Sequence, residues 1–379
     1  MDIIPFNKPY MTGRELWYIA QAHAVGHLSG DGGFTKKCHA WLEAQTGAYK
    51  ALLTHSCTAA LEMAAILAGI QPGDEVIMPS YTFVSTANAF VARGGVPVFV
   101  DIRSDTLNID ETLIEAAITP RTKAIVPVHY AGVACEMDVI MDIARRHGLL
   151  VIEDAAQGIM AAYKDKPLGS IGHLGTYSFH ETKNIIAGEG GALLVNDEQF
   201  AERAEIVREK GTNRSQFFRG QVDKYTWVDV GSSYLIGEVV AAFLWAQMEE
   251  AAAITERRLA VWRLYHEALR AFENMGVLRR PRIPEYCQPN AHMYYILLES
   301  LETRSRLITY LKARGVNTVF HYVPLHSSPA GRMYGRVGSP MVNTESVSDR
   351  LLRLPLWVGM GQAEIDAVIG GLNKGLCPS

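Results

Sequence analysis

The sequence predicts an α/β protein with a large domain built on a mostly parallel sheet and a smaller C-terminal α+β domain. Strand and helix patterns alternate from residue 50 to residue 154, and the strand segments are apolar throughout. Strands of this kind are buried on both faces, as in parallel sheets that helices cover on both sides. A chain of 379 residues is also too long for one simple core. We place the large domain at 1–245 and the smaller one at 246–379.

The predicted elements of the large domain follow this alternation in order. Helices at 11–25 and 34–45 lie on either side of a glycine-rich loop and precede a strand at 50–54. Further strands are expected at 75–78, 97–100, 124–129 and 149–152, and further helices from Ser56 and at 85–93, 110–118 and 136–147. Ligands of such sheets bind beyond the carboxyl ends of the strands. The segments 54–59, 79–83, 129–130 and 154–157 should therefore converge with the loop around Lys183.

The second half of the chain is less regular. A polar and aromatic stretch at 211–234 is too long for a plain connection, and loops of this length usually carry function. A long helical segment at 237–273 follows and bridges to the smaller domain. That domain is expected to contain strands at 292–299 and 317–322, and helices at 304–314 and 364–372.

Composition excludes several classes of function. The net charge is −4 without a basic patch or an acidic tail, so nucleic acid and anionic membranes are poor partners. The N-terminus does not resemble a signal peptide, and no apolar run approaches the ~20 residues that span a bilayer. The five cysteines are scattered without a C-x-x-C pair, which is typical of reduced thiols and not of a zinc site. We expect a cytoplasmic protein that binds no metal.

Lys183 lies between two predicted strands. An alternating apolar segment ends at Ser178, and a second apolar run begins at Ala192 after a glycine-containing loop. A lysine in a desolvated pocket loses its preference for the charged form and can form a Schiff base with a carbonyl. A solvated surface lysine is the commoner case for any single lysine. The motif Val151-Ile-Glu-Asp-Ala-Ala-Gln157 favours the reactive interpretation.

Asp154 ends the strand in that motif and has three possible roles. A carboxylate there could bind a metal, act as a general base or pair with a protonated ring nitrogen. Metal binding is disfavoured because no His/Asp cluster at ligand spacing accompanies it. Pyridoxal 5′-phosphate needs an amine, a carboxylate beside its ring nitrogen, a phosphate site and an aromatic face. Lys183 is the candidate amine, and Asp154 is the candidate carboxylate. Thr58 and Ala59 with Ser178 are assigned to the phosphate site, and Phe83 or Tyr81 to the aromatic face.

Two further observations support this cofactor. The turn at Thr58 and Ala59 opens a helix whose free N–H groups and dipole suit an anion, although Ser56 and Thr58 could simply cap that helix. Gln157 follows Asp154 by three residues and can hydrogen-bond the phenolic oxygen of the cofactor. A nucleotide-binding enzyme without pyridoxal would need a G-x-G-x-x-G or Walker loop after the first strand, and the chain has neither.

The chain resembles the DegT/DnrJ/EryC1 sugar aminotransferases, which have the aspartate aminotransferase fold of fold-type-I pyridoxal phosphate enzymes. The resemblance covers nearly the whole sequence, and its motifs lie at 73–77, 79–88, 127–132, 152–157 and 178–184. Stretches at 29–34, 211–227 and 320–326 are similar to the members that aminate a TDP-4-keto-6-deoxyhexose at C4. The resemblance implies that reaction, with glutamate as the amino donor.

The resemblance also implies roles for individual residues. Lys183 would form the internal aldimine and shuttle a proton, and Asp154 would pair with the pyridinium nitrogen. It further implies a homodimer with active sites shared across the subunit interface. Many relatives carry Gly-Tyr-Asn-Tyr-Arg where this chain has Gly231-Ser-Ser-Tyr-Leu235, so the asparagine that reaches the phosphate of the neighbouring subunit is missing here. Ser232, Ser233 or the loop 213–227 could replace that contact. Arg219 and Lys224 are candidates to bind the nucleotide diphosphate, and His326 is a candidate to contact the sugar.

Alternative functions remain open at this point. Within the family, the chain could be a TDP-3-keto-sugar 3-aminotransferase. The pyridoxal-dependent dehydratases are excluded because they carry histidine in place of Lys183. A pyridoxal-binding regulator without turnover should carry a DNA-binding module, and the sequence shows none.

Overall fold

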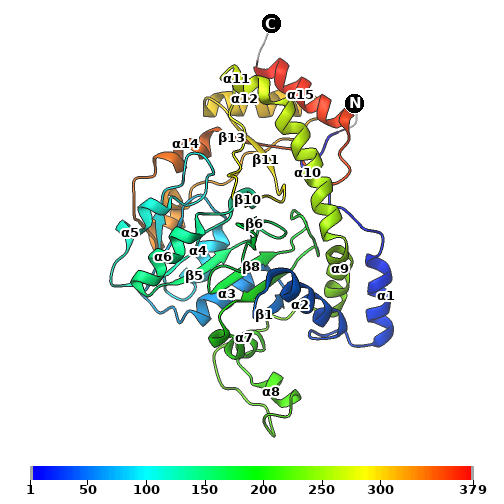
Figure 1. Ribbon diagram of the computed structural model, residues 1–379, viewed down its shortest axis with the longest axis vertical. Coiled ribbons are helices and arrows are strands. Elements are labelled where there is room, and N and C mark those ends of the chain that lie inside the picture. The colour runs from blue at the N-terminus through cyan, green and yellow to red at the C-terminus, as the bar shows by residue number, and fades with distance from the viewer. Residues whose placement is uncertain (1–2, 377–379) are drawn as a thin grey trace.

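The computed structural model describes residues 3–376 and is organised around an eight-stranded sheet (Figure 1). The strand order is β1-β9-β8-β5-β4-β2-β3-β12. Only β9 runs antiparallel to its neighbours, and the other pairings are parallel. The strands are β1 (Lys50–Thr54), β2 (Glu75–Pro79), β3 (Val96–Val100), β4 (Thr122–Ile125), β5 (Leu150–Asp154), β8 (Leu174–Ser178), β9 (Gly191–Val195) and β12 (Arg336–Val337). The predicted α/β class with a mostly parallel sheet is confirmed.

Helices cover both faces of this sheet because its strands are apolar on both sides. Alternate residues of one strand enter different cores: Leu53 of β1 joins one cluster and Leu52 joins the other. The first cluster contains residues of α1 (Glu15–Val25), α2 (Gly33–Thr46), α5 (Ile114–Ala117), α6 (Met137–His147) and α9 (Glu238–Glu249). The second contains residues of α3 (Cys57–Leu67), α4 (Val84–Val91) and α7 (Ala201–Arg208). The sheet is thus buried from both sides, as its continuous apolar runs predict.

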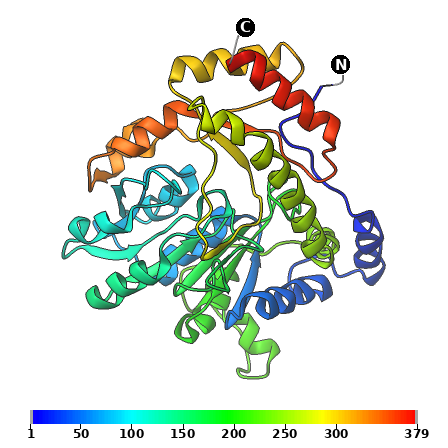
Figure 2. The ribbon, with the colours of Figure 1, turned by 45° about the horizontal axis from the view of Figure 1, so that its top comes forward.

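The C-terminal part has a core of its own. Buried side chains such as Tyr265, Ile296, Leu352 and Val368 pack together, and Ile4 near the N-terminus joins them. The helices here are α10 (Ala251–Ala268), α11 (Arg270–Asn274), α12 (Leu301–Lys312), α13 (Pro329–Tyr334), α14 (Val342–Arg350) and α15 (Gln362–Leu376). Helices α12 and α15 lie side by side at the top of Figure 2. The domain boundary at residue 245 falls inside α9 and stays a prediction.

Two small sheets complete the strand inventory of the described residues. Strands β11 (Tyr294–Leu297) and β13 (Leu351–Leu354) pair antiparallel in the C-terminal part. A three-stranded sheet joins β10 (Cys287–Gln288), β6 (Ala162–Tyr163) and β7 (Lys166–Pro167). The pairings of β11 with β13 and of β10 with β6 connect segments that are far apart in sequence, whereas β6 and β7 form a local hairpin.

Five predicted elements differ from the structure, and three of them lie in the first half of the chain. The strand expected at 124–129 ends at Ile125, because Pro127 has no N–H to continue the ladder. The helix expected at 110–118 is a 3-10 turn followed by a single helical turn, and Asp110 caps it by accepting the N–H of Thr112. The helix expected to begin at residue 11 begins at Glu15, whose carboxylate accepts the N–H groups of Thr12 and Gly13.

The other two differences lie in the second half of the chain. The segment 237–273 is three helices, not one, because the backbone leaves helical geometry at Glu250 and Leu269. The strand expected at 317–322 does not form: only Val319 makes a bridge, with Arg353. The side chains of 319–322 line a cavity instead, and β13 takes the expected strand's place beside β11.

The polar stretch at 211–234 extends away from the sheet at the lower end of Figure 1, with the short helix α8 (Arg214–Phe218) at its tip. Its two ends are tied by a bridge between Thr212 and Trp227. Gly211 is required at the base, because it has φ of +73° and any Cβ there would overlap the carbonyl of Asp229. The segment is a folded projection and not an extended connection.

Candidate active site

A cavity of about 830 Å³ opens where the carboxyl ends of the parallel strands meet the C-terminal part. Its first wall consists of segments that follow strands, namely Ser56–Thr58 after β1, Thr82–Ser85 after β2, Asp154–Gln157 around the end of β5, and residues 178–190 after β8. Its second wall is built by Arg258, His292 and residues 319–322 and 353–356. Of the segments predicted to converge, only 129–130 lies outside the lining.

Lys183 lies in this cavity, on the loop between the antiparallel strands β8 and β9. Burial lowers the pKa of its amine below the usual value of 10.5, because water no longer stabilises the charge. The nearby Cys57 and Asp154 favour the charged form, and Arg353 opposes it. Among these influences burial is the largest, so the amine is shifted toward the nucleophilic neutral form.

Asp154 ends β5 in the same cavity and is buried. One carboxylate oxygen accepts a hydrogen bond from the Thr86 hydroxyl at 2.6 Å, and the other accepts the N–H of Ala156 at 3.1 Å. These two donors fix the direction of the carboxylate. The charge is not used in an ion pair with any described residue, so it is free to act on a ligand.

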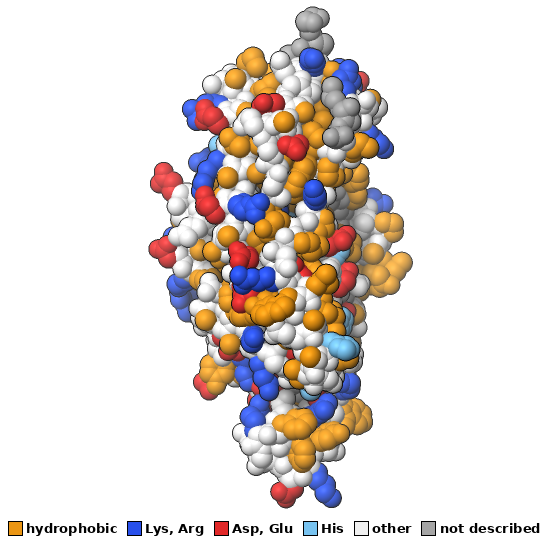
Figure 3. Space-filling model, turned by 90° about the vertical axis from the view of Figure 1, so that its right-hand side faces the viewer, with side chains coloured by type: hydrophobic (Ala, Val, Ile, Leu, Met, Phe, Trp, Pro, Cys, Tyr) orange, Lys and Arg blue, Asp and Glu red, His pale blue; other side chains and the backbone are white. Residues whose placement is uncertain are grey.

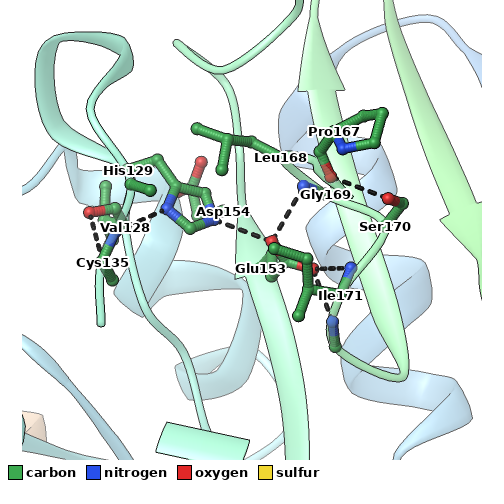
Figure 4. A network of polar contacts seen from close by, with 12 residues as sticks. Val128, His129, Cys135, Glu153, Asp154, Pro167, Leu168, Gly169, Ser170 and Ile171 are labelled. Carbon is green, nitrogen blue, oxygen red and sulfur yellow. Dashed lines mark hydrogen bonds and ion pairs between the residues drawn. The ribbon is translucent and has the colours of Figure 1, made fainter. Parts of the chain in front are cut away.

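Glu153 precedes Asp154 on β5 and points to the opposite face of the strand (Figure 4). Its carboxylate accepts hydrogen bonds from the backbone N–H groups of Gly169, Ile171 and Gly172. The side chain of His129 is completely buried, and its Nε2 lies 2.8 Å from the Glu153 carboxylate. The Nδ1 atom of His129 accepts the N–H of Cys135, so the ring proton is on Nε2 and is donated to Glu153. The network holds β5 against the turn that leads into β8, and thereby holds Asp154 in place. His129 is therefore structural.

The predicted phosphate site lies at the first turn of α3. The hydroxyls of Thr58 and Ser85 are 2.8 Å apart, and Ser178 lies on the same wall. The N–H groups of Cys57 and Thr58 have no intrahelical partner at this position. Ala59 is buried outside the lining, and its N–H donates to the Ser56 side chain. Ser56 therefore caps the helix and occupies the N–H of Ala59, which leaves Ala59 unavailable as the predicted backbone donor to a phosphate. The anion site at the first two N–H groups, of Cys57 and Thr58, stays a prediction.

Gly191 explains how this turn reaches the neighbouring strand so closely. It is the first residue of β9, and a Cβ at this position would collide with the backbone of Ser56 and Cys57. Glycine therefore permits the start of α3 to lie directly against the strand beside the Lys183 loop.

The predicted aromatic and amide partners also line the cavity. Phe83 does so and is 56% exposed, whereas Tyr81 is buried in a core outside the lining, so Phe83 is the aromatic face available to a ring. The Gln157 side chain accepts the N–H of Ala131 at 2.7 Å and donates to the Tyr322 hydroxyl at 2.9 Å. Both the oxygen and the nitrogen of the Gln157 side-chain amide are thus held by hydrogen bonds at the cavity wall.

Three predicted substrate contacts lie apart from the cavity of this chain. Arg219 pairs with Glu205 at 2.8 Å beside α7, and Lys224 is exposed on the projecting segment. The Nδ1 atom of His326 shares a hydrogen bond of 2.7 Å with the Ser80 hydroxyl, and His326 does not line the cavity. The roles of these three residues stay predictions.

Several residues of the site were missed by the sequence reasoning. Thr86 orients Asp154, Ser85 contacts Thr58, and Arg353 and Tyr322 belong to the second wall. The run of hydroxyls after β2, from Ser80 to Thr86, was an available signal for the first two. Arg353 and Tyr322 had no such signal, because they reach the cavity only through the packing of the C-terminal part.

The described residues fit pyridoxal phosphate. A buried amine, a buried unpaired carboxylate, a hydroxyl-rich helix N-terminus and an aromatic ring face one cavity. Within residues 3–376, no group of three or more His, Cys, Asp or Glu side chains is placed to hold a metal ion. None of the described helices is both long and apolar enough to cross a membrane.

Comparison with known proteins agrees with this fit. The family model of the DegT/DnrJ/EryC1/StrS aminotransferases matches residues 9–373. The spore coat polysaccharide biosynthesis protein SpsC of Bacillus subtilis is 34% identical over 374 residues, which is 97% of this chain and 95% of SpsC.

Solved structures show the same relationship. The PLP form of Spr1654 from Streptococcus pneumoniae superimposes with a TM-score of 0.90 at 25% identity, covering 98% of both chains. DesI, solved in the presence of its TDP-sugar product, has a TM-score of 0.87 at 27% identity, covering 99% of this chain and 94% of DesI. The chain is therefore a pyridoxal-phosphate-dependent sugar aminotransferase and belongs to the DegT/DnrJ/EryC1/StrS aminotransferase family.

Proposed function

We propose that the protein transfers the amino group of L-glutamate to C4 of a TDP-4-keto-6-deoxyhexose and yields the 4-amino-4,6-dideoxy sugar nucleotide. This is the activity of dTDP-4-amino-4,6-dideoxygalactose transaminase. The observation that carries the proposal is that Lys183, whose amine pKa is lowered by burial, and the buried carboxylate of Asp154 line one cavity. The TDP-sugar product of the related DesI supports the substrate class.

The proposed chemistry assigns one task to each residue. When bound, pyridoxal phosphate supplies an electron-accepting ring. Asp154 would place a negative charge beside the ring nitrogen, and Thr58, Ser85 and Ser178 would hold the phosphate. Lys183 takes the proton from Cα of the donor at its Nζ and delivers it to the cofactor side, and it reverses this transfer for the sugar. Burial lowers the pKa of this amine and so favours the neutral form, which is the form that can accept a proton.

We also propose that the protein works in the cytoplasm as a homodimer whose active sites are shared. The projecting segment 211–234 supports this proposal. It carries exposed aromatic side chains, and Figure 3 shows apolar groups at the lower tip of the molecule, where the segment lies. These residues are Phe217, Phe218, Tyr225 and Trp227, of which Trp227 is 79% exposed. Apolar rings projecting from a polar loop suit a contact with a second copy of the chain.

The reaction is tested by supplying TDP-4-keto-6-deoxyglucose and L-glutamate to the purified, cofactor-loaded protein. NMR of the isolated product should show an amine at C4 of a 6-deoxyhexose, together with 2-oxoglutarate. The Lys183→Ala variant serves as the control and should yield neither. Failure of the 4-keto sugar to react, while the 3-keto isomer is aminated at C3, would contradict the proposal in favour of the 3-aminotransferase.

A further inference from the structure

A buried chain of two hydroxyl groups leads to the Asp154 carboxylate. The side-chain oxygens of Thr82 and Thr86 are 2.8 Å apart, and the Thr86 hydroxyl donates to Asp154 at 2.6 Å. Both threonines are almost completely buried. They lie four residues apart across the first turn of α4, on the segment that follows β2. The chain therefore joins the start of this helix to the end of β5, where Asp154 lies.

The number of protons available sets the direction of these hydrogen bonds. A threonine hydroxyl can donate only one. Because Thr86 donates its proton to Asp154, its oxygen accepts the proton of Thr82. The opposite direction needs a protonated Asp154, and it would leave the Thr82 proton with no acceptor in the described part of the chain. The two hydroxyls are thus arranged for the ionised form of Asp154.

The hydrogen bonds matter because the Asp154 charge is buried. A buried charge without an ionic partner is stable only if it accepts hydrogen bonds, and Asp154 accepts those of Thr86 and Ala156. A donor that itself accepts a hydrogen bond is polarised and donates more strongly, so Thr82 strengthens the bond from Thr86. The first turn of α4 also carries the positive end of the helix dipole, which favours a negative charge bound there.

The same short segment carries two other groups of the site. Phe83, the aromatic ring available to the cofactor, lies between the two threonines in sequence, and so does Ser85, which contacts Thr58. The aromatic face, a hydroxyl of the phosphate site and the hydrogen bond to Asp154 are therefore positioned by one element. A change at Thr82 or Thr86 that preserves the backbone should affect only the last of these.

We propose that Thr82 and Thr86 are positioning residues that keep Asp154 ionised and thereby keep the ring nitrogen of the cofactor protonated. This inference rests on the proposed place of Asp154 beside that nitrogen. Thr86 acts through Asp154, and Thr82 acts through Thr86. When donation to Asp154 weakens, its carboxylate becomes more basic, and the proton that it shares with the ring nitrogen moves toward Asp154.

The proposal is tested with Thr86→Val and Thr82→Val, which each remove one hydroxyl and keep the shape of the side chain. The measurement is the nitrogen-15 chemical shift of the ring nitrogen, recorded at neutral pH with labelled pyridoxal phosphate bound to each variant. In Thr86→Val this signal should move toward that of neutral pyridine, and the glutamate half-reaction should slow about tenfold or more. Thr82→Val keeps the bond from Thr86 to Asp154 and should cause smaller changes in the same direction.

Conservative variants separate hydrogen bonding from packing. Thr86→Ser and Thr82→Ser retain the hydroxyl and should restore the chemical shift of the natural enzyme, although they remove a methyl group. Thr255 offers a matched control, because it is buried in α10, donates to the carbonyl of Ala251 at 2.8 Å and does not line the cavity. Thr255→Val makes the same chemical change and should leave the chemical shift and the half-reaction unchanged.

The Asp154→Asn variant separates this proposal from the proposed function. If Asp154→Asn moves the nitrogen-15 signal and Thr86→Val does not, the role given to the threonines is wrong and that of Asp154 stands. If Asp154→Asn leaves the signal unchanged, the proposed place of Asp154 fails, and the inference fails with it. An effect of Thr82→Val confined to the TDP-sugar concentration that gives half-maximal rate would also overturn the proposal, because Thr82 would then be a substrate contact.

Discussion

At the scale of single residues, the site depends on placing an amine and a carboxylate where water is scarce. Burial is the main reason that the pKa of Lys183 falls. The Asp154 carboxylate is held in one orientation because it accepts hydrogen bonds from the Thr86 hydroxyl and the Ala156 N–H. The two residues lie on neighbouring parallel strands, β8 and β5, or just beyond their ends. Their chemistry follows from this placement.

Replacing Lys183 by Ala should abolish transamination and the visible absorbance of the bound cofactor, because no other amine of the cavity is available to bind it covalently. The side chain points into the cavity, so the fold should survive, with an unchanged circular dichroism spectrum. The exposed Lys36 provides a control, and Lys36→Ala should keep full activity. Turnover with an unchanged cofactor spectrum in Lys183→Ala would disprove the role of this lysine.

Replacing Asp154 by Asn should preserve the shape of the site, since the amide oxygen can still accept one of the two hydrogen bonds. It removes the charge that stabilises the ring nitrogen, so the rate of the glutamate half-reaction should fall about a hundredfold or more. Cofactor affinity, measured by equilibrium dialysis, should change much less. A near-normal half-reaction rate would show that Asp154 serves another purpose.

The sequence was informative about residues that local motifs connect to strand ends. Lys183, Asp154, Gln157, Thr58, Ser178 and Phe83 all line the predicted cavity. Arg353 and Tyr322 could not be predicted, because they enter the site from the opposite wall through tertiary packing. Tyr322 lies in the stretch 320–326 that carries part of the family resemblance, but that stretch does not show which of its side chains reach the cavity.

At the scale of elements, long apolar runs predicted the strands well, but the residues at which strands and helices end were harder to predict. The position of Pro127 decides where β4 ends, although its surroundings remain apolar. The two-residue strand β12 could not be predicted, because it is too short to have a pattern. It is held in place by ion pairs as well as by its ladder: Arg336 of β12 pairs with the buried Glu75 of β2, which also binds Arg121.

This cluster predicts a pH-dependent contribution to stability. Mainly through Arg336, the pKa of Glu75 falls from 4.5 to about 2 in the folded protein. A carboxyl group with a lowered folded pKa stabilises the fold fully above its unfolded pKa, and this contribution is lost as the pH falls from about 4.5 toward 2. Allowing for the exposure of the arginines, Glu75→Gln should cost about 2 kcal/mol of unfolding free energy at pH 7.

Urea denaturation at several pH values provides the measurement. The difference between the natural protein and Glu75→Gln should be constant from pH 7 to pH 5 and shrink below about pH 4.5. Glu115 offers a control, since it pairs with Arg146 on the surface, and Glu115→Gln should have little effect at any of these pH values. A difference that grows on acidification would exclude the ion-pair explanation.

At the scale of the whole molecule, the main question is which active site the loop with Arg219 and Lys224 serves. Both lie on the segment 211–234, at the lower end of Figure 1, and neither lines the cavity of its own chain. Length and composition predicted a functional loop here, and the structure shows it as a projection with exposed aromatic rings. Whether the loop serves a cavity other than that of its own chain depends on the proposed homodimer, and a single sequence contains no direct signal for that.

We expect the loop to serve the active site of the partner subunit. Arg219→Ala or Lys224→Ala should then raise the Michaelis constant for the TDP-sugar about tenfold, because each removes a charge-assisted contact to the diphosphate. The glutamate half-reaction should remain nearly normal. Lys210, a lysine at the base of the same loop, provides a control variant, Lys210→Ala, with unchanged kinetics.

Mixed dimers provide the decisive measurement. When Arg219→Ala subunits exchange with Lys183→Ala subunits, a loop that acts across the interface places both defects in one site of each heterodimer. The other site then combines an intact Lys183 with an intact loop, so activity at low TDP-sugar concentration should rise above that of either parent. If the loop acts within its own subunit, each site of the heterodimer keeps one defect. Mixtures that show proven subunit exchange but no gain in activity would therefore place the loop in its own subunit's site.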